Sequence, residues 1–133
     1  MSQLPFDRLM RELASYLGTP LSFDRGIYRL IVPLPMSRQQ EVSASIRNDD
    51  DGRQIIAFVS TVGEARRGIE PWNLLRANGS PIYSRAALLG DMIVVIASQL
   101  LETAQAEEVL LILREVAHFA DQLERKHFRG DMF

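Results

Sequence analysis

The chain has 133 residues, of which 47% are hydrophobic and 24% charged, and its formal net charge is −2 at pH 7. This length suits a single domain over residues 1–133, and the composition excludes an intrinsically disordered chain. The sequence contains no cysteine, which excludes disulfide frameworks, thiol catalysis, zinc ribbons and iron–sulfur clusters.

Membranes and nucleic acids are not expected as partners. The longest strongly apolar stretch, Met92–Ala97, is far shorter than the ~20 residues that a membrane-spanning helix needs. The first residues have neither the basic start nor the long apolar run of a secretory signal, so we expect a cytoplasmic protein. Basic residues cluster only in short pairs such as Arg66-Arg67, which indicates no nucleic-acid-binding surface.

The first predicted element is an amphipathic helix from Pro5 to Leu17. Proline is tolerated in the first turn because its missing N–H would have no partner there. Gly18 and the following Thr19-Pro20 end the helix. Its apolar residues recur at helical spacing and form one stripe, made of Phe6, Leu9, Met10, Leu13, Tyr16 and Leu17.

The next part of the chain shows three strand patterns. The first is rich in β-branched residues and is expected to end at Pro33 and Pro35. The second alternates between apolar and polar residues, and the third is apolar on both faces, which is typical of a central strand. A polar turn at Asn48–Gly52 joins these last two strands as an antiparallel hairpin. The expected strands are Ile27–Val32, Glu41–Arg47 and Gln54–Val62.

A short helix is predicted to begin at Pro71 and to end at Asn78-Gly79. Two further strands, Ile82–Leu89 and Met92–Ala97, flank a tight hairpin turn at Gly90-Asp91. A long helix from about Thr103 to His127 follows. This order of elements, α-β-β-β-α-β-β-α, predicts an α+β fold with a five-stranded, largely antiparallel sheet that is packed by the N- and C-terminal helices.

The apolar face of the last predicted helix covers about half of its circumference. Asp121 falls on the opposite, polar half, where Leu111 is the single apolar residue. A face this wide fits a helix that lies on the sheet, and it also fits a helix whose edge meets a partner. A lone exposed leucine is common and needs no special explanation. The apolar face consists of Val109, Leu110, Ile112, Leu113, Val116, Ala117, Phe119, Ala120 and Leu123.

The order of elements and the C-terminal half resemble a known group of proteins. The matching residues are Leu74–Asn78 in the short helix, the hairpin around Leu89–Met92 and the helical segment Leu110–Glu124. The chain resembles the small type III secretion chaperones of the Tir chaperone family and the related YbjN-like proteins, and its stretch Ala120–Glu124 leans towards the YbjN-like branch. The resemblance in element order covers nearly the whole chain, whereas the residue match lies mostly from Trp72 onwards.

This resemblance implies a non-enzymatic, usually homodimeric and mildly acidic protein that holds a partner polypeptide along its surface. An alternative within the same fold is a YbjN-like regulatory or signalling domain that has no secretion client. A small enzyme that acts on an unidentified ligand is a third alternative, from a different class.

The sequence offers few residues for metal binding. His118 and His127 lie about 180° apart on the helix wheel, so they cannot share a metal within one chain. Glu115 and His118 form one Glu-x-x-His step, but a di-iron site needs two such steps, which favours an exposed polar face. The segment Asp49–Gly52 resembles part of a calcium loop, yet the acidic ligands at the first and twelfth positions are missing. We therefore expect a hairpin turn there.

Three further motifs also favour structural interpretations. Gly63, Gly68 and the arginines between them lack a phosphate-loop fingerprint, which favours a flexible polar connection. No serine lies in a Gly-x-Ser-x-Gly elbow, as a hydrolase of that kind requires. The sequon Asn78-Gly79-Ser80 is interpreted as a helix stop and turn. We predict no catalytic residue, no metal site and no cofactor.

Trp72 is the strongest candidate for an interface residue. It lies beside Leu74 and Leu75 in a helix too short to bury it, so it is either a core anchor or a contact to a partner. Buried aromatic residues dominate the energetics of interfaces. We predict a homodimer that binds an unidentified protein partner, and the predicted partner or dimer surface consists of Trp72, Leu75, Ile82 and Leu111.

Overall fold

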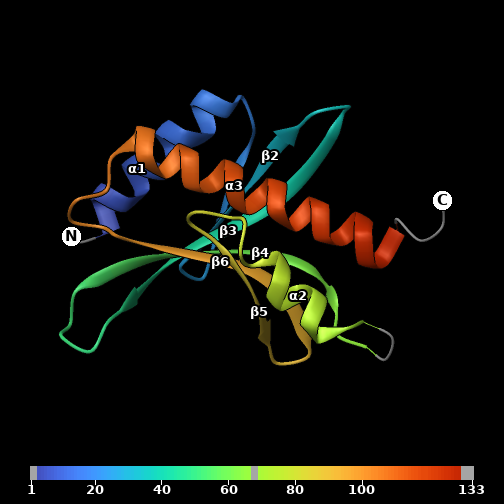
Figure 1. Cartoon of the computed structure of the whole chain (residues 1–133). Coiled ribbons are helices and arrows are strands. Elements are labelled where there is room, and N and C mark those ends of the chain that lie inside the picture. The colour runs from blue at the N-terminus through green and yellow to red at the C-terminus, as the bar shows by residue number, and fades with distance from the viewer. Residues whose placement is uncertain (1–2, 67–68, 130–133) are drawn as a thin grey trace.

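The computed structural model describes residues 3–66 and 69–129 (Figure 1). Its helices are α1 (Gln3–Leu17), α2 (Pro71–Ala77) and α3 (Ala106–Glu124), and a π-helical turn, η1 (Arg125–Arg129), continues α3. Its strands are β1 (Leu21–Asp24), β2 (Ile27–Leu34), β3 (Arg38–Asn48), β4 (Gln54–Glu64), β5 (Arg85–Leu89) and β6 (Met92–Leu100).

The six strands form one antiparallel sheet in the order β1-β2-β3-β4-β6-β5. The first four strands follow one another as hairpins. The chain then passes through α2 to β5, which lies at the edge, and β6 returns between β5 and β4. The last strand in the sequence is therefore an interior strand of the sheet.

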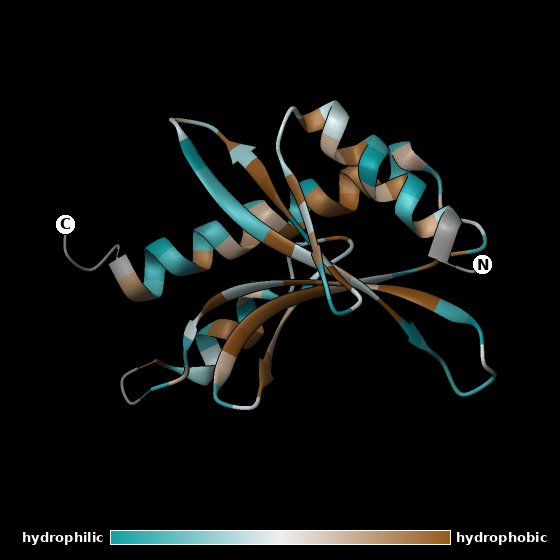
Figure 2. Ribbon diagram, turned by 180° about the vertical axis from the view of Figure 1, so that it is seen from behind, coloured by the Kyte–Doolittle hydropathy of each residue, from teal (hydrophilic) through white to brown (hydrophobic). Residues whose placement is uncertain are grey.

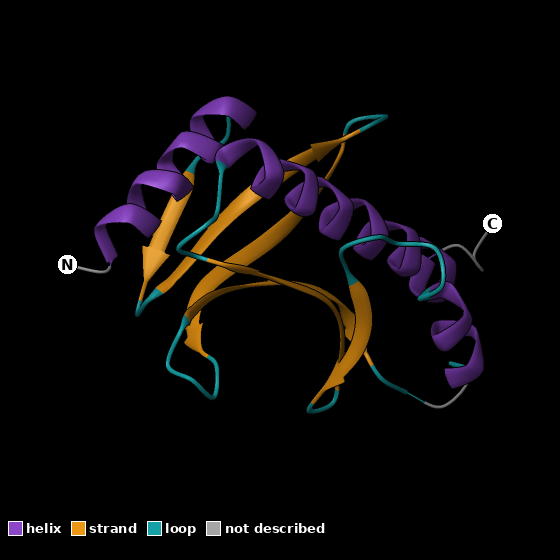
Figure 3. Ribbon diagram, turned by 60° about the vertical axis from the view of Figure 1, so that its left-hand side comes forward, coloured by secondary structure: helices purple, strands orange, loops and turns teal. Residues whose placement is uncertain are grey.

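The helices cover one face of this sheet. α3 packs on β2, β3, β4 and β6, and α1 packs on β1, β2 and α3, so that the two helices lie side by side on a strongly curved sheet (Figure 3). α2 covers the β5 end of the same face, because Leu74 and Ala77 pack against the same core as Ala86 of β5. The opposite face has no helix on it among the described residues, and Ile96 and Leu100 of β6 are exposed there.

The hydrophobic core lies between the helices and the sheet. The hydropathy colours in Figure 2 show long hydrophobic stretches in the strands, with hydrophilic residues at the β3–β4 turn. All nine residues of the apolar face predicted for the last helix are buried. The largest fully buried side chains are Phe6, Phe58, Met10, Leu13, Leu30, Ile56, Leu113, Val32, Val42, Val95, Val109 and Val116.

Asp121 of α3 is also buried, with only 1% of its surface exposed. Its Oδ2 accepts hydrogen bonds from Arg38 Nε at 2.9 Å and from Arg125 Nε at 3.2 Å. The helix wheel placed Asp121 on the polar half, and that placement is wrong. The side chain of Arg38, at the start of β3, extends to α3 and pairs with this carboxylate. The Asp121 side chain therefore faces charged groups of the chain, whereas the helix wheel predicted that it faces solvent.

The predicted α+β class and the order of helices are confirmed, but the expected five-stranded sheet is wrong. The sixth strand is β1, which pairs with residues Ile27–Leu30 of β2. Because β1 lies at the edge, three of its four residues are exposed, and the alternation of apolar and polar residues in Leu21–Asp24 is only four residues long.

Several strand boundaries also differ from the expectation, among them the end of β2 and the start of β5. β2 continues through Pro33, which pairs with Gln39 of β3. A proline is tolerated at this position because β1 pairs with β2 only as far as Leu30, so Pro33 lies where β2 is an edge strand. β5 begins at Arg85 and not at Ile82. The tight turn predicted at Gly90-Asp91 is present, and Gly90 has a φ of 59° at the first central position, as in a type II′ turn.

No helix in the described parts of the chain combines the length and the apolar character that crossing a membrane requires.

Candidate functional site

The short helix α2 is set by residues at its two ends. The Glu70 side chain accepts a hydrogen bond from Trp72 N at 3.3 Å, and Pro71 occupies the first turn. Asn78 forms the C-terminal cap through its backbone N–H. None of the seven residues of α2 is buried in the chain. The helix is therefore held by its caps and by partial packing, and its outer side faces solvent.

Large apolar side chains are exposed on and beside α2. Trp72 is 64% exposed and Leu75 is 59% exposed, and Leu88 of the edge strand β5 is 64% exposed. Leu75 and Leu88 line one groove of about 520 Å³, together with Ile69, Pro71, Leu74, Ala86, Ala87 and Ile93. We call this groove with Trp72 the α2–β5 surface.

Two polar residues that line this groove, Asn78 and Arg66, already interact with other groups of the chain. The Asn78 amide bonds the backbone of Ala86 at 2.7 and 3.2 Å. The Arg66 guanidinium lies 4.9 Å from the centre of the Phe128 ring, which it faces as a cation–π partner. Phe128 in turn packs against Gly63, where a Cβ would approach its ring to 2.6 Å. The groove is thus suited to apolar side chains of a ligand and offers no reactive group from these residues.

The four residues predicted for the partner surface fall into two places. Trp72 and Leu75 are three residues apart on α2, so they are neighbours on that helix. Ile82 lies in the loop before β5, and its backbone N–H bonds Glu115 of α3. Leu111 is 54% exposed and lies one turn before Glu115 on the same side of α3. Their role as a dimer surface stays a prediction.

Sequence reasoning missed Leu88 as a surface residue. It lies within the segment expected to be a strand, but the sequence does not show that this strand is at the edge of the sheet. The signal that was available is the run Ala86–Leu89, which is apolar without alternation and precedes a tight turn. In an edge strand, such a run leaves apolar side chains uncovered.

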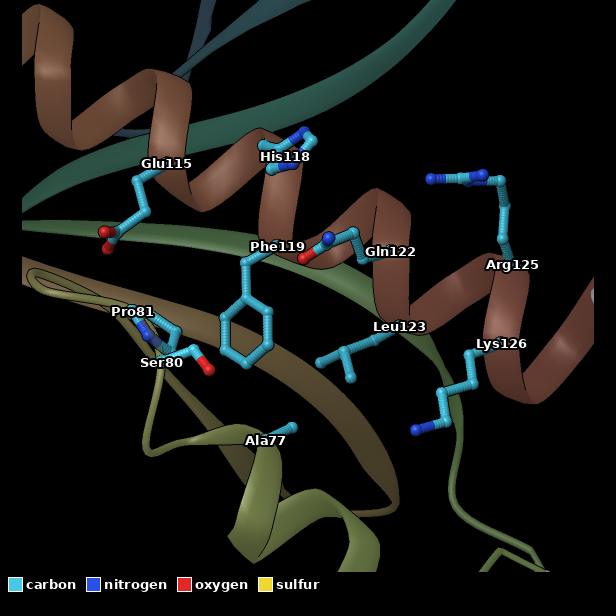
Figure 4. A pocket seen from close by; sticks show the side chains of 10 residues that line it. All are labelled: Ala77, Ser80, Pro81, Glu115, His118, Phe119, Gln122, Leu123, Arg125 and Lys126. Carbon is cyan, nitrogen blue, oxygen red and sulfur yellow. The ribbon is translucent and has the colours of Figure 1, made fainter.

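A second cavity, of about 710 Å³, lies between the end of α2 and the C-terminal half of α3 (Figure 4). Its apolar side is formed by Phe119, Leu123 and Ala77, and polar side chains such as Gln122 and Lys126 line the rest. The cavity is amphipathic and open, and it is bounded by the loop that follows α2.

Glu115 lines this cavity, but its carboxylate oxygens accept hydrogen bonds from the loop that precedes β5. Its Oε1 accepts from Ile82 N, and its Oε2 accepts from Tyr83 N, Ser84 N and Ser84 Oγ, all at 2.7–2.8 Å. Burial raises the pKa of Glu115, but these hydrogen bonds outweigh burial and hold the pKa below its ordinary value. The carboxylate anchors the loop and has no free oxygen for a metal shared with His118.

The other motifs considered in the sequence also have structural roles. Both oxygens of Asp49 accept hydrogen bonds at the β3–β4 turn, from Asp51 N and from the backbone and side chain of Arg53. The hydrogen bond from the Arg53 backbone is the largest of the effects that hold the pKa of Asp49 below its ordinary value. Gly63 belongs to β4, and Gly68 lies outside the described residues. Within the described ranges, no cluster of three or more His, Asp or Glu side chains is arranged to hold a metal ion.

Comparisons with known proteins give a match among solved structures. No family model and no curated protein sequence matches the chain. Among solved structures, a chain from the structure of the HopA1–SchA chaperone–effector complex is similar, with a TM-score of 0.67. The two are 16% identical, and the match covers 94% of this chain and 97% of that chain. The chain therefore has a chaperone-like fold over nearly its whole length.

Proposed function

We propose that this chain binds another polypeptide as a homodimer, in the manner of a type III secretion chaperone, and that it catalyses no reaction. The observation that carries the proposal is the α2–β5 surface, where Trp72, Leu75 and Leu88 are exposed beside an apolar groove. The fold shared with a chain of a chaperone–effector complex supports it. Exposed apolar patches of this kind are typical of protein-binding sites.

The second copy of the chain is the proposed occupant of the α2–β5 surface. A helix of seven residues has little stability of its own and depends on packing. Complete burial of a large apolar side chain contributes about 1.5–3 kcal/mol before the entropy of association is subtracted. In a twofold-symmetric dimer every such contact occurs twice, so Trp72 and Leu75 contribute from both copies.

A client polypeptide would then bind apolar surface that the second copy leaves free. The sheet face opposite the helices exposes Ile96 and Leu100. At the β1 edge of the sheet, on the face that the helices cover, the Phe23 ring is also exposed, 4.5 Å from the ring of its cross-strand partner Tyr28. These side chains can shield apolar residues of an extended segment without any covalent step.

The environments of the acidic side chains support binding over catalysis. Glu115 anchors a loop, Asp121 joins α3 to β3, and Asp49 closes a turn. A general acid or base needs a group that is free to meet a substrate proton. These three carboxylates instead accept hydrogen bonds from groups of the chain itself.

The dimer is tested by measuring mass in solution by light scattering at micromolar concentration. We expect twice the 15.1 kDa mass of one chain for the wild type and one chain mass for the double variant Trp72→Ala/Leu75→Ala. Tyr16→Ala, which removes an exposed aromatic residue from α1, is the matched control and should remain dimeric. A wild-type protein that is strictly monomeric contradicts the proposed dimer.

Partner binding is tested by a pull-down from extract of the native cell, with the wild type and the double variant in parallel. Recovery of a secreted effector supports the chaperone function. Recovery of a protein that is not secreted favours a YbjN-like regulatory domain, the alternative with the same fold. Recovery of small molecules alone counts against both and favours an enzyme.

A further inference from the structure

The two edges of the sheet differ in how their backbone groups are satisfied. An edge strand normally presents a row of unpaired N–H and C=O groups, to which a strand of another molecule can pair. At β1, the described residues place no side-chain hydrogen bond on the outer backbone. At β5 and in the segment that leads into it, side chains from three parts of the chain form hydrogen bonds with the outward-facing backbone groups.

The pairing of β5 with β6 determines which β5 residues point their backbone N–H and C=O groups away from the sheet. Leu89 pairs with Met92 across the two-residue turn, and Ala87 pairs with Val94. In an antiparallel strand, the backbone groups of successive residues point alternately towards the neighbour and away from it. Ala86 and Leu88 therefore direct their N–H and C=O groups to the outside of the sheet.

Asn78 occupies both outward groups of Ala86. Ala86 N donates to Asn78 Oδ1 at 2.7 Å, and Asn78 Nδ2 donates to Ala86 O at 3.2 Å. The side-chain amide thus makes the same pair of hydrogen bonds that the backbone N–H and C=O of one residue in a neighbouring antiparallel strand would make. It stands where an incoming strand would have to lie.

Side chains also form hydrogen bonds with backbone groups of the segment that leads into β5. Ser84 N donates to Glu115 Oε2 at 2.8 Å, and Ser84 O accepts from Arg85 Nη1 at 2.6 Å. Pro81 O accepts from the same arginine nitrogen at 2.9 Å. From Pro81 to Ala86, the edge is covered by side chains, and Leu88 is the remaining outward-facing residue of the strand.

We infer that Asn78, supported by Glu115 and Arg85, closes the β5 edge to strand addition. Copies of this chain therefore cannot join their sheets at β5 into a continuous sheet. If the proposed homodimer forms, its two copies meet at β5 through side chains such as Leu75 and Leu88, and not through backbone pairing. The closure itself does not depend on that dimer.

The test compares Asn78→Ala with the wild type, using a synthetic peptide of residues 84–90 as the probe. The peptide carries the β5 sequence and can pair antiparallel with β5. We expect it to bind the variant and not the wild type. A peptide with alternate N-methylated backbone amides keeps its side chains but cannot pair, so it should not bind the variant.

Asn73→Ala is the matched control, because Asn73 lies on the same helix and, among the described contacts, its side chain bonds only the exposed side chain of Arg76. It should behave like the wild type. Amide exchange measured by NMR gives a second readout, in which the Ala86 amide should exchange at least about tenfold faster in the Asn78→Ala variant. Circular dichroism checks that the variant is folded.

Three results overturn the inference: no peptide binding by folded Asn78→Ala, equal binding of the N-methylated peptide, or edge binding by the wild type. If Asn78→Ala does not fold, Asn78→Asp replaces it, since the carboxylate keeps the acceptor for Ala86 N and loses the donor to Ala86 O. Failure of the dimer would appear instead as a monomeric wild type with an unchanged Asn78 result.

Discussion

Two helices lie on the same face of the sheet and differ in how far they are buried. α3 has ten buried residues out of nineteen, whereas α2 has none out of seven. Both carry large apolar side chains, so hydrophobicity alone does not separate them. The difference is that α3 crosses the middle of the sheet, where four strands cover it, and α2 lies at the sheet's end. The buried apolar residues of α3 hold the fold together, whereas Trp72 and Leu75 on the outer side of α2 remain exposed.

The largest loss of stability is expected in α3. Leu113→Ala removes a fully buried side chain from the centre of the core and should lower the free energy of unfolding by about 2–5 kcal/mol. Urea unfolding followed by circular dichroism measures this change. Leu111→Ala on the exposed side of the same helix is the control and should change stability by less than about 0.5 kcal/mol.

The contact between α3 and the loop after α2 should show the next largest effect. Glu115→Gln replaces a carboxylate that accepts four hydrogen bonds, and its amide N–H groups would face other donors. We expect a loss of about 1.5–3 kcal/mol at neutral pH, the usual range for hydrogen bonds to a charged group. Ser84→Ala, which removes one of the four donors, should lose less.

The same contact gives a pH dependence with a defined sign. The pKa of Glu115 is lower in the folded chain than its ordinary value of about 4.3. Its stabilising contribution is therefore complete above pH 4.3 and is lost as the pH falls towards the folded pKa. The stability difference between wild type and Glu115→Gln should shrink over that range. A difference that stays constant down to pH 3 would contradict the assigned role of the carboxylate.

A smaller effect is expected where η1 meets β4. Gly63→Ala would place a Cβ 2.6 Å from the Phe128 ring, and overpacking of this kind costs about 1–3 kcal/mol. Phe128→Ala should relieve the clash, so the two substitutions should couple strongly in a double-mutant cycle measured by urea unfolding. Additive effects would show that the ring does not pack on Gly63.

The smallest change in stability is expected in α2. Leu75→Ala removes a side chain that is 59% exposed, so under conditions where the chain is monomeric its free energy of unfolding should change by less than about 0.5 kcal/mol. Unfolding measured at low protein concentration tests this. A loss as large as that of Leu113→Ala would erase the contrast between the two helices.

Local patterns predicted most of the fold. The apolar face of α3 was predicted because helical spacing alone decides which of its residues point together. Asp121 could not be placed in this way, since its burial depends on Arg38, which lies 83 residues away in the sequence. β1 was missed because the alternation in Leu21–Asp24 covers only four residues, which is too short to distinguish an edge strand from a turn or loop.

The candidate site was predictable only in part. The exposure of Trp72 and Leu75 was among the expected alternatives, because a short helix cannot bury many residues. Ile82 was expected to begin the strand that leads to the Gly90-Asp91 turn, but Glu115 accepts hydrogen bonds from the backbone N–H groups of this segment and holds it as a loop. Such a contact between distant segments leaves no local trace in the sequence.

The position of β6 inside the sheet has a consequence for synthesis on the ribosome. Until β6 emerges, β4 lacks one of its two neighbours, although it is apolar on both faces. The nascent chain thus presents a hydrophobic strand that is paired with β3 on one side only, a state prone to aggregation. A protein whose proposed task is to shield the apolar segments of another chain passes through a stage in which its own central strand is unshielded.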